Sequence, residues 1–176
     1  MGVMVDAIDV TIHSDHPFAD AVRDPARQFR GRLGGRVSLW TTGSGAARTG
    51  LTITSLLAVG GEPWRLVAAL DPDAEFTDAL AGEQRAVVTL LDADQLRLAE
   101  AFGGGPAPGG PFKIGDWTQT PWGPAPSDAS AWAGVELESQ QAVGWSLLTT
   151  VRIAQIVIQD AEDAPLRHFR GRFELG

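Results

Sequence analysis

The sequence predicts a mainly β fold, in which antiparallel strands form a barrel and short helices lie at its periphery. Several segments are rich in β-branched and aromatic residues and partly alternate apolar with polar positions, which is typical of strands. The helical segments between them are short. A parallel sheet would need a crossover helix between successive strands, so an antiparallel arrangement fits the order of segments better.

Seven segments are predicted as strands. The first ends at Thr42, where Gly43-Ser44-Gly45 is typical of a hairpin turn, and the second is expected to be long and unbroken. Gly60-Gly61-Glu62-Pro63 then turns the chain. The predicted strands cover roughly 36–42, 47–59, 64–70, 86–91, 131–141, 145–158 and 166–174.

Short helices are expected at four places. One begins near Ser14 or Asp15, and another runs from Asp24-Pro25 to about Gly31. A third covers about 71–81. The fourth follows Asp92, which is predicted to form a capping box with Gln95. Leu98 and Phe102 lie four residues apart on this helix, so both are expected to face the core.

Residues 103–130 contain seven glycines and six prolines and are predicted to be a long loop. The segment also carries Phe112, Trp117 and Trp122, which a linker between domains would seldom contain. We therefore expect it to lie over the barrel, with residues 1–176 forming a single domain.

Composition excludes several classes of function. The chain has 176 residues, 44% of them hydrophobic, and a formal net charge of −8, which disfavours nonspecific binding to nucleic acid or to an anionic membrane. It has no cysteine, so thiolate chemistry and Cys-ligated zinc are excluded. With no signal-peptide pattern and no apolar run long enough to span a bilayer, a cytoplasmic location is expected.

Five arginines form a basic cluster in a chain whose net charge is negative. Arg23, Arg27, Arg30, Arg32 and Arg36 lie within fourteen residues. We interpret them as partners of surface carboxylates; the alternative is a cationic rim for an anionic ligand.

Catalytic residues cannot be named from the sequence. His13 and His16 are interpreted as part of a solvated turn, and no metal site is predicted. No nucleophile-elbow pattern accompanies the histidines, and Gly103-Gly104-Gly105 lacks the residues that follow in a phosphate-binding P-loop. An enzyme of this composition would depend on a cofactor for its chemistry.

The run from Gly50 to Ser55 is the best candidate for ligand binding. In a strand, Thr52 and Thr54 would project from one face, with Ile53 and Ser55 on the other. Hydroxyl groups can hydrogen-bond a phosphate without a charge, although threonine is also common in strands for structural reasons.

The order of motifs resembles the flavin reductase-like family of FMN-binding split barrels. Arg36-Val37-Ser38-Leu39-Trp40-Thr41-Thr42, a short turn and Gly50-Leu51-Thr52-Ile53-Thr54-Ser55 are similar to that family's paired strands before a proline. Ala86–Leu91, the helix from Gln95 to Phe102, Gly134–Glu138 and Pro165–Phe173 resemble its later segments. The resemblance covers about residues 29–173.

The resemblance implies a homodimer that binds FMN, with FAD as an alternative, and takes electrons from NADH or NADPH. Its site would comprise a phosphate-binding set, a backbone stretch beside the isoalloxazine ring and a cover from the long loop. These residues are, in that order, Arg48, Thr52, Thr54 and Ser55; Leu57, Ala58, Val59 and Gly60; and Phe112, Lys113 and Trp117.

The sequence departs from the family at the reactive end. Gly144-Trp145-Ser146 stands where members often carry Gly-Asp-His, and Ala58-Val59-Gly60 replaces a Ser-Val-Ser. We interpret Trp145 as a core residue; the alternative is that it stacks on a ring.

The resemblance implies an NAD(P)H-dependent flavin reductase, or the reductase component of a two-component monooxygenase with that monooxygenase as partner. Direct oxidation or reduction of a small organic substrate is a second hypothesis. A flavin carrier or interaction module without turnover is the third, and the departures from the family favour it more than they would in a typical member.

Overall fold

The computed structural model describes residues 25–159 and 164–175. The helix expected near Ser14 and the pair His13 and His16 lie outside the described residues.

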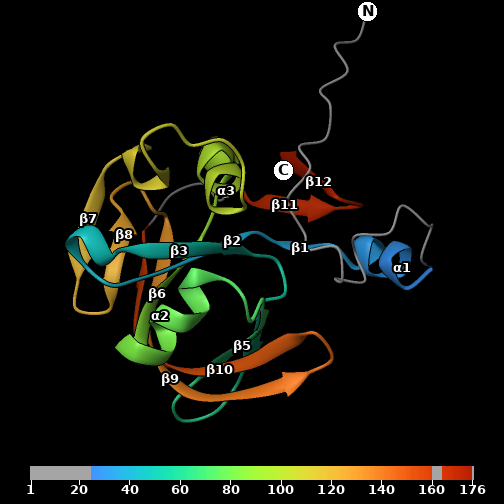
Figure 1. Cartoon of the computed structure of the whole chain (residues 1–176), viewed down its shortest axis with the longest axis horizontal. Helices are drawn as coiled ribbons and strands as arrows, with labels where there is room; N and C mark the ends of the chain where they lie inside the picture. Colours follow the sequence, from blue (N-terminus) through green and yellow to red (C-terminus); the bar gives the residue numbers. More distant parts are fainter. Residues whose placement is uncertain (1–24, 160–163, 176) are drawn as a thin grey trace, which may run out of the picture.

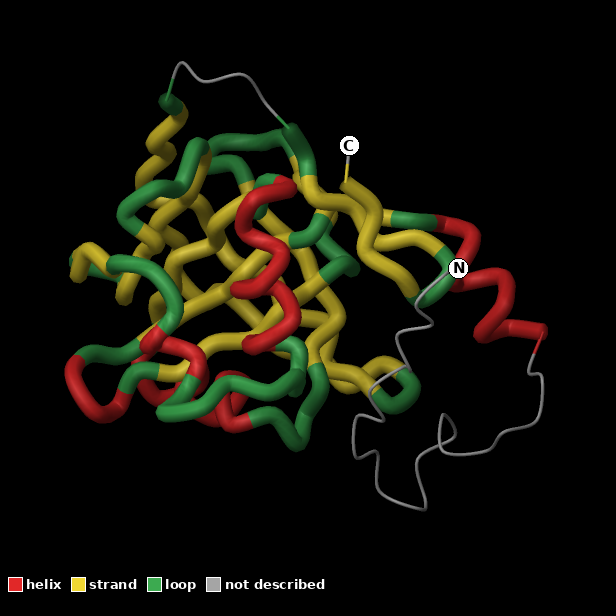
Figure 2. The backbone as a smooth tube through the Cα atoms, turned by 90° about the horizontal axis from the view of Figure 1, so that it is seen from above, coloured by secondary structure: helices red, strands yellow, loops and turns green. Residues whose placement is uncertain are grey.

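Seven antiparallel strands form the main sheet, in the order β3-β2-β6-β9-β10-β5-β4. Their bounds are β2 Ser38–Thr42, β3 Thr49–Ile53, β4 Leu57–Val59, β5 Arg65–Leu70, β6 Arg85–Leu90, β9 Ala131–Val143 and β10 Ser146–Ile158. The sheet curls on itself (Figures 1 and 2), so that Ile53 of β3 and Leu66 of β5 share one core with Trp40 and Val151. The fold is the antiparallel split barrel that was expected.

The predicted strand 47–59 is wrong as a single element. It divides into β3 and β4, which lie at opposite edges of the sheet. Residues Thr54–Leu56 carry the chain from one edge to the other, across the opening of the barrel; we call them the corner segment. A continuous strand could pair at only one edge, so the chain must leave strand geometry here.

A small sheet of β1 Gly35–Arg36, β11 Leu166–Phe169 and β12 Arg172–Leu175 lies beside the barrel, in the order β1-β11-β12. Helix α1, Pro25–Leu33, precedes it and begins at the proline that predicted its start. The helix ends later than expected, before Gly34, whose φ of 66° is a left-handed conformation that favours glycine.

The other helices are short and peripheral, as predicted. They are η1 Gly45–Ala47, α2 Glu75–Glu83, η2 Ala93–Gln95, α3 Leu96–Phe102 and η3 Pro111–Lys113. Helix α2 begins after the predicted position because the Asp71 carboxylate accepts the Asp73 N–H at 2.9 Å and forms a turn there. The capping box of Asp92 and Gln95 is present, and Leu98 and Phe102 are buried.

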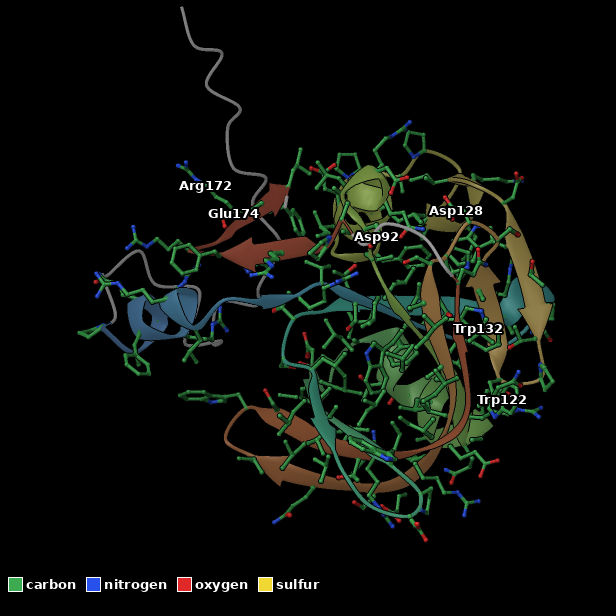
Figure 3. The ribbon with its side chains drawn as sticks, turned by 180° about the vertical axis from the view of Figure 1, so that it is seen from behind. Asp92, Trp122, Asp128, Trp132, Arg172 and Glu174 are labelled. Carbon is green, nitrogen blue, oxygen red and sulfur yellow. The ribbon has the colours of Figure 1, made fainter. Side chains whose placement is uncertain are left out.

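Asp92 also joins the small sheet to the barrel. Its carboxylate pairs with Arg36 at 2.9 Å and accepts a hydrogen bond from the Ser130 hydroxyl. Gln95, its capping partner, donates to Asp128 at 2.9 Å, and Figure 3 shows both aspartates near α3. One carboxylate thus connects β1, α3 and the chain that leads into β9.

The segment 103–130 is only partly a loop. It contains the hairpin of β7 Trp117–Thr120 and β8 Gly123–Pro126, and β8 is buried. The indole of Trp122 covers Gly134 of β9 so closely that a Cβ there would lie 2.3 Å from Cδ2 of the ring. The segment does pack on the barrel, as expected, but the hairpin was not predicted because its glycines and prolines resemble loop sequence.

Candidate functional site

A cavity of about 1310 Å³ lies where the barrel opens toward the small sheet. Five parts of the chain line it: α1 with the Gly34-Gly35 link, the end of β3 with the corner segment, the end of β5, the β9–β10 turn and the β11–β12 turn. The lining residues are Arg27, Gln28, Arg30–Gly35, Leu51–Leu56, Ala69, Asp71, Val143–Ser146, His168, Arg170 and Gly171.

The predicted hydroxyl residues Thr52, Thr54 and Ser55 all line this cavity, but they are not equivalent. Thr52 donates to the Ala99 carbonyl of α3 at 2.8 Å. Ser55 donates to the Ala69 carbonyl at 3.1 Å and accepts the Ala69 N–H at 3.0 Å. Thr54 is exposed, and its hydroxyl has no hydrogen-bond partner among the described residues. Thr54 is therefore the hydroxyl whose proton a bound phosphate can accept.

Backbone donors accompany the Thr54 hydroxyl. Within the described parts of the chain, the N–H groups of Thr54, Ser55 and Leu56 donate to no backbone carbonyl. Such groups seek an acceptor, and successive N–H groups outside regular structure commonly bind anions. The corner segment thus offers a phosphate-sized group neutral donors from both side chain and backbone.

Gly35 holds the corner segment in place. A Cβ at position 35 would lie 2.6 Å from the carbonyl oxygen of Thr54, so only glycine lets β1 approach the corner this closely. Gly35 was not among the predicted site residues. Its contact with Thr54 is a property of the fold that spacing in the sequence does not show.

The interpretation of Trp145 as a core residue is wrong. Trp145 lies in the two-residue turn between β9 and β10, lines the cavity and is 64% exposed. Gly144 takes φ 58° at the first turn position, which suits a type II′ hairpin turn and leaves the following side chain at the tip. The indole therefore lies at the cavity and not in the core of the barrel.

The clustered arginines divide between the two interpretations made from the sequence. Arg36 pairs with Asp92, as a surface ion pair would. Arg27, Arg30 and Arg32 line the cavity, as a cationic rim would, and Arg170 from the β11–β12 turn joins them. Arg23 lies outside the described residues.

His168 is half-buried beside this rim and was not among the predicted site residues. Burial, and to a smaller extent the charge of Arg30, lowers the pKa of His168 below its ordinary value. The imidazole is therefore mostly neutral at neutral pH, so the positive charge of the cavity comes from the arginines.

The remaining predicted site residues lie away from the cavity. Leu57–Val59 form the edge strand β4, with Leu57 60% exposed, and Gly60 follows it. Phe112 and Trp117 pack on Phe102, with ring centroids 4.9 and 5.7 Å away, and the Arg48 guanidinium lies over Phe112 at 4.6 Å. Lys113 is exposed on η3. The structure thus gives Arg48, Phe112 and Trp117 a packing role and does not bring them to Thr54.

Two negative findings concern the described residues. They contain no group of three or more histidine and carboxylate side chains placed to hold a metal ion. None of the helices they form has the length and apolar character needed to cross a membrane.

Known proteins resemble this chain in sequence and in structure. The sequence model of the "Flavin reductase like domain" matches residues 30–175. The 4-hydroxyphenylacetate 3-monooxygenase reductase component of Salmonella typhimurium is 27% identical over 151 residues, which cover 84% of this chain and 88% of that protein. FMN reductase (NADH) RutF of Variovorax paradoxus is 31% identical over 106 residues, covering 60% of this chain and 59% of that protein.

Solved structures agree with the split-barrel fold. The NADH:FAD oxidoreductase SgcE6 of Streptomyces globisporus superposes with a TM-score of 0.77 at 22% identity, covering 86% of this chain and 94% of that chain. The styrene monooxygenase flavin reductase of Pseudomonas putida S12 superposes with a TM-score of 0.77 at 19% identity, covering 87% of this chain and 97% of that chain. With a family model that matches nearly the whole described chain, this protein belongs to the flavin reductase-like family.

Proposed function

We propose that this protein is an NAD(P)H-dependent flavin reductase that binds FMN and serves as the reductase component of a two-component monooxygenase. The observation that carries the proposal is the corner segment, which lines the cavity. Among the described residues, its Thr54 hydroxyl has no hydrogen-bond partner and three of its N–H groups donate to no backbone carbonyl. Two curated relatives support the activity by name, one as a monooxygenase reductase component and one as an FMN reductase.

The residues present fit a flavin phosphate. The corner segment would hold the phosphate through neutral donors, and Gly35 keeps those donors in position through its contact with Thr54. When bound, the flavin supplies the ring that accepts hydride from the nicotinamide. The chain's task is to hold both rings in contact and to exclude water, which requires no proton-donating side chain.

Trp145 is the chain's aromatic surface at this cavity. An exposed indole stacks favourably on another flat ring, so Trp145 would stack on the flavin or the nicotinamide. Trp145 would thus replace the family's Gly-Asp-His segment as a ring contact, without supplying a titratable side chain.

We further propose that the protein is a homodimer in the cytoplasm. Leu57 and Val59 of β4 and the neighbouring Trp64 are large apolar side chains that are 60%, 39% and 56% exposed. Exposed apolar residues on an edge strand favour association, because isolated edges of this kind are rare in monomers. The predicted contact of Leu57–Gly60 with the isoalloxazine ring stays a prediction.

Turnover assays test the reductase proposal. Purified protein should oxidise NADH or NADPH at a rate that rises with added FMN. Thr54→Val should raise the KM for FMN about tenfold, because a hydrogen bond to a charged group is lost. Thr52→Val is the matched control: its hydroxyl already bonds α3, so it should lower stability and leave the KM for FMN nearly unchanged. Equal KM values for both variants would refute the corner assignment.

The carrier hypothesis has one specific observation in its favour, the replacement of the family's Gly-Asp-His by Gly144-Trp145-Ser146. Tight binding of FMN without any oxidation of NADH or NADPH would select it. Failure to bind FMN or FAD at all would overturn both proposals.

A further inference from the structure

The charge of the cavity is opposite to that of the chain. The formal net charge of the chain is −8, yet among the described residues four arginines, Arg27, Arg30, Arg32 and Arg170, line the cavity together with one carboxylate, Asp71. We call these four residues the arginine wall. A cavity of this local sign concentrates anionic ligands against the overall repulsion of the protein.

Two elements far apart in the sequence build the arginine wall. The Arg170 N–H donates to the Gly31 carbonyl of α1 at 2.7 Å, and a Cβ at Gly31 would lie 3.4 Å from the Arg170 Cα. Helix α1 therefore sits directly on the β11–β12 turn at Gly31. This contact brings the side chains of α1 and the turn to the same rim.

The arginine wall and the corner segment are chemically different anion sites. The corner offers a hydroxyl and N–H groups without charge, whereas the wall offers guanidinium groups, which bind phosphate oxygens in a bidentate manner. The cavity volume of about 1310 Å³ also exceeds the 300–1,000 Å³ that commonly holds one small ligand. Both features suit ligands that carry phosphate groups at two separate places.

We propose that the arginine wall is a second phosphate subsite, which binds a phosphate that FAD carries and FMN lacks, or one that NADPH carries and NADH lacks. The inference rests on the proposed function, because the corner segment is taken to hold the phosphate of the flavin. Two sources share this chemistry: the phosphate that the adenosine part of FAD adds to that of FMN, and the ribose phosphate that distinguishes NADPH from NADH.

The test compares four ligands on the full chain. Arg32→Gln and Arg170→Gln each remove one exposed charge from the wall. Arg172→Gln is the matched control, since Arg172 lies two residues from Arg170 on the same hairpin, does not line the cavity and points away from α1 in Figure 3. The affinities for FMN and FAD are measured by flavin fluorescence, and the KM values for NADH and NADPH by steady-state oxidation.

We expect each wall variant to weaken FAD binding or to raise the KM for NADPH about tenfold, with FMN and NADH nearly unchanged. A loss confined to FAD identifies the flavin as the source, and a loss confined to NADPH identifies the electron donor. The loss should diminish at high salt, because exposed charges are screened.

Two results would overturn the inference and leave the proposed function standing. In the first, the wall variants have the same affinities and KM values as Arg172→Gln for every ligand. In the second, they lose equal affinity for FMN and FAD, which would place the phosphate of FMN itself on the arginine wall. If the unaltered chain binds no flavin, the proposed function fails first and the inference fails with it.

Discussion

Thr54 and Ser55 are neighbours in the corner segment, yet among the described residues only the Ser55 hydroxyl has a hydrogen-bond partner. Ser55 ties the corner to Ala69 of β5, and Thr54 faces the cavity without a partner among the described residues. The sequence predicted both as phosphate ligands, because spacing shows which residues are close but not which hydrogen bonds the fold has already used. The same limit applies to Thr52, whose hydroxyl bonds α3.

Gly35→Ala tests the close approach of β1 to the corner segment. The new methyl group would lie 2.6 Å from the Thr54 carbonyl oxygen, so the corner must move. We expect weaker FMN binding and a loss of about 1–3 kcal/mol in the free energy of unfolding, measured by titration and by urea denaturation. Gly82→Ala is the control: nothing lies within 4 Å of its Cβ, so it should leave FMN binding unchanged. Unchanged affinity in Gly35→Ala would contradict the role given to Gly35.

Thr89→Val tests a buried hydroxyl on β6. The Thr89 hydroxyl is buried and has no hydrogen-bond partner among the described residues. Valine has nearly the same shape and removes the unsatisfied group, so the free energy of unfolding should rise by about 1 kcal/mol in urea denaturation. Thr41→Val should have the opposite effect, because the Thr41 hydroxyl donates to the Pro124 carbonyl at 2.5 Å. A loss of stability in Thr89→Val would mean that the hydroxyl has a partner.

Among the helices and strands, the sequence predicted the ones whose residues carry a strong local pattern. β6 and β10 were found close to their limits, and the capping box of Asp92 was found because its two residues bond each other locally. The division of 47–59 was not predicted, since β3 and β4 separate to reach opposite sheet edges. The β7–β8 hairpin was not predicted because Gly and Pro dominate its sequence. Its burial also depends on residues distant in the sequence, such as Gly134.

The packing of α1 near β11 predicts a pH dependence of stability. Burial, and then Arg30, lowers the pKa of His168 from 6.5, so just below that pH the unfolded chain binds more protons than the folded one. Stability should therefore fall as the pH decreases through about 6.5 and level off once the folded state is also protonated.

His168→Gln should reduce this loss, measured by urea denaturation from about pH 8 to about pH 5. His13 and His16 are present in both proteins, so their own titration cancels in the comparison. In Arg30→Gln, the pKa of His168 followed by NMR should rise toward its ordinary value. An unchanged pKa would show that Arg30 does not lie close to the imidazole.

For the whole molecule, the opening of the barrel is what creates a site. The corner segment crosses that opening, and the small sheet with α1 lies against it, so five separated parts of the chain meet around one cavity. Composition and motif order predicted the barrel and the family. They did not predict the contributions of His168 and Arg170, and they left Trp145 between a core position and a stacking role, because these depend on how two hairpin turns and a helix are placed in space.

The proposed homodimer is a further expectation at this scale. Sedimentation equilibrium should give twice the mass of the chain, whose own mass is 18.6 kDa. Leu57→Lys with Val59→Lys should shift the protein toward the monomer, because two charges would be buried without partners. Ile156→Lys is a control, since this residue is also exposed and apolar but lies on β10. A monomeric unaltered chain would contradict the proposal.

The central claim is that the corner segment binds the phosphate of a flavin. Calorimetric titration with FMN and with riboflavin, which differ only in that phosphate, tests it most directly. The unaltered chain should bind FMN about tenfold or more tightly than riboflavin, and Thr54→Val should lower that ratio several-fold while riboflavin affinity stays the same. An equal ratio in the two proteins would contradict the account.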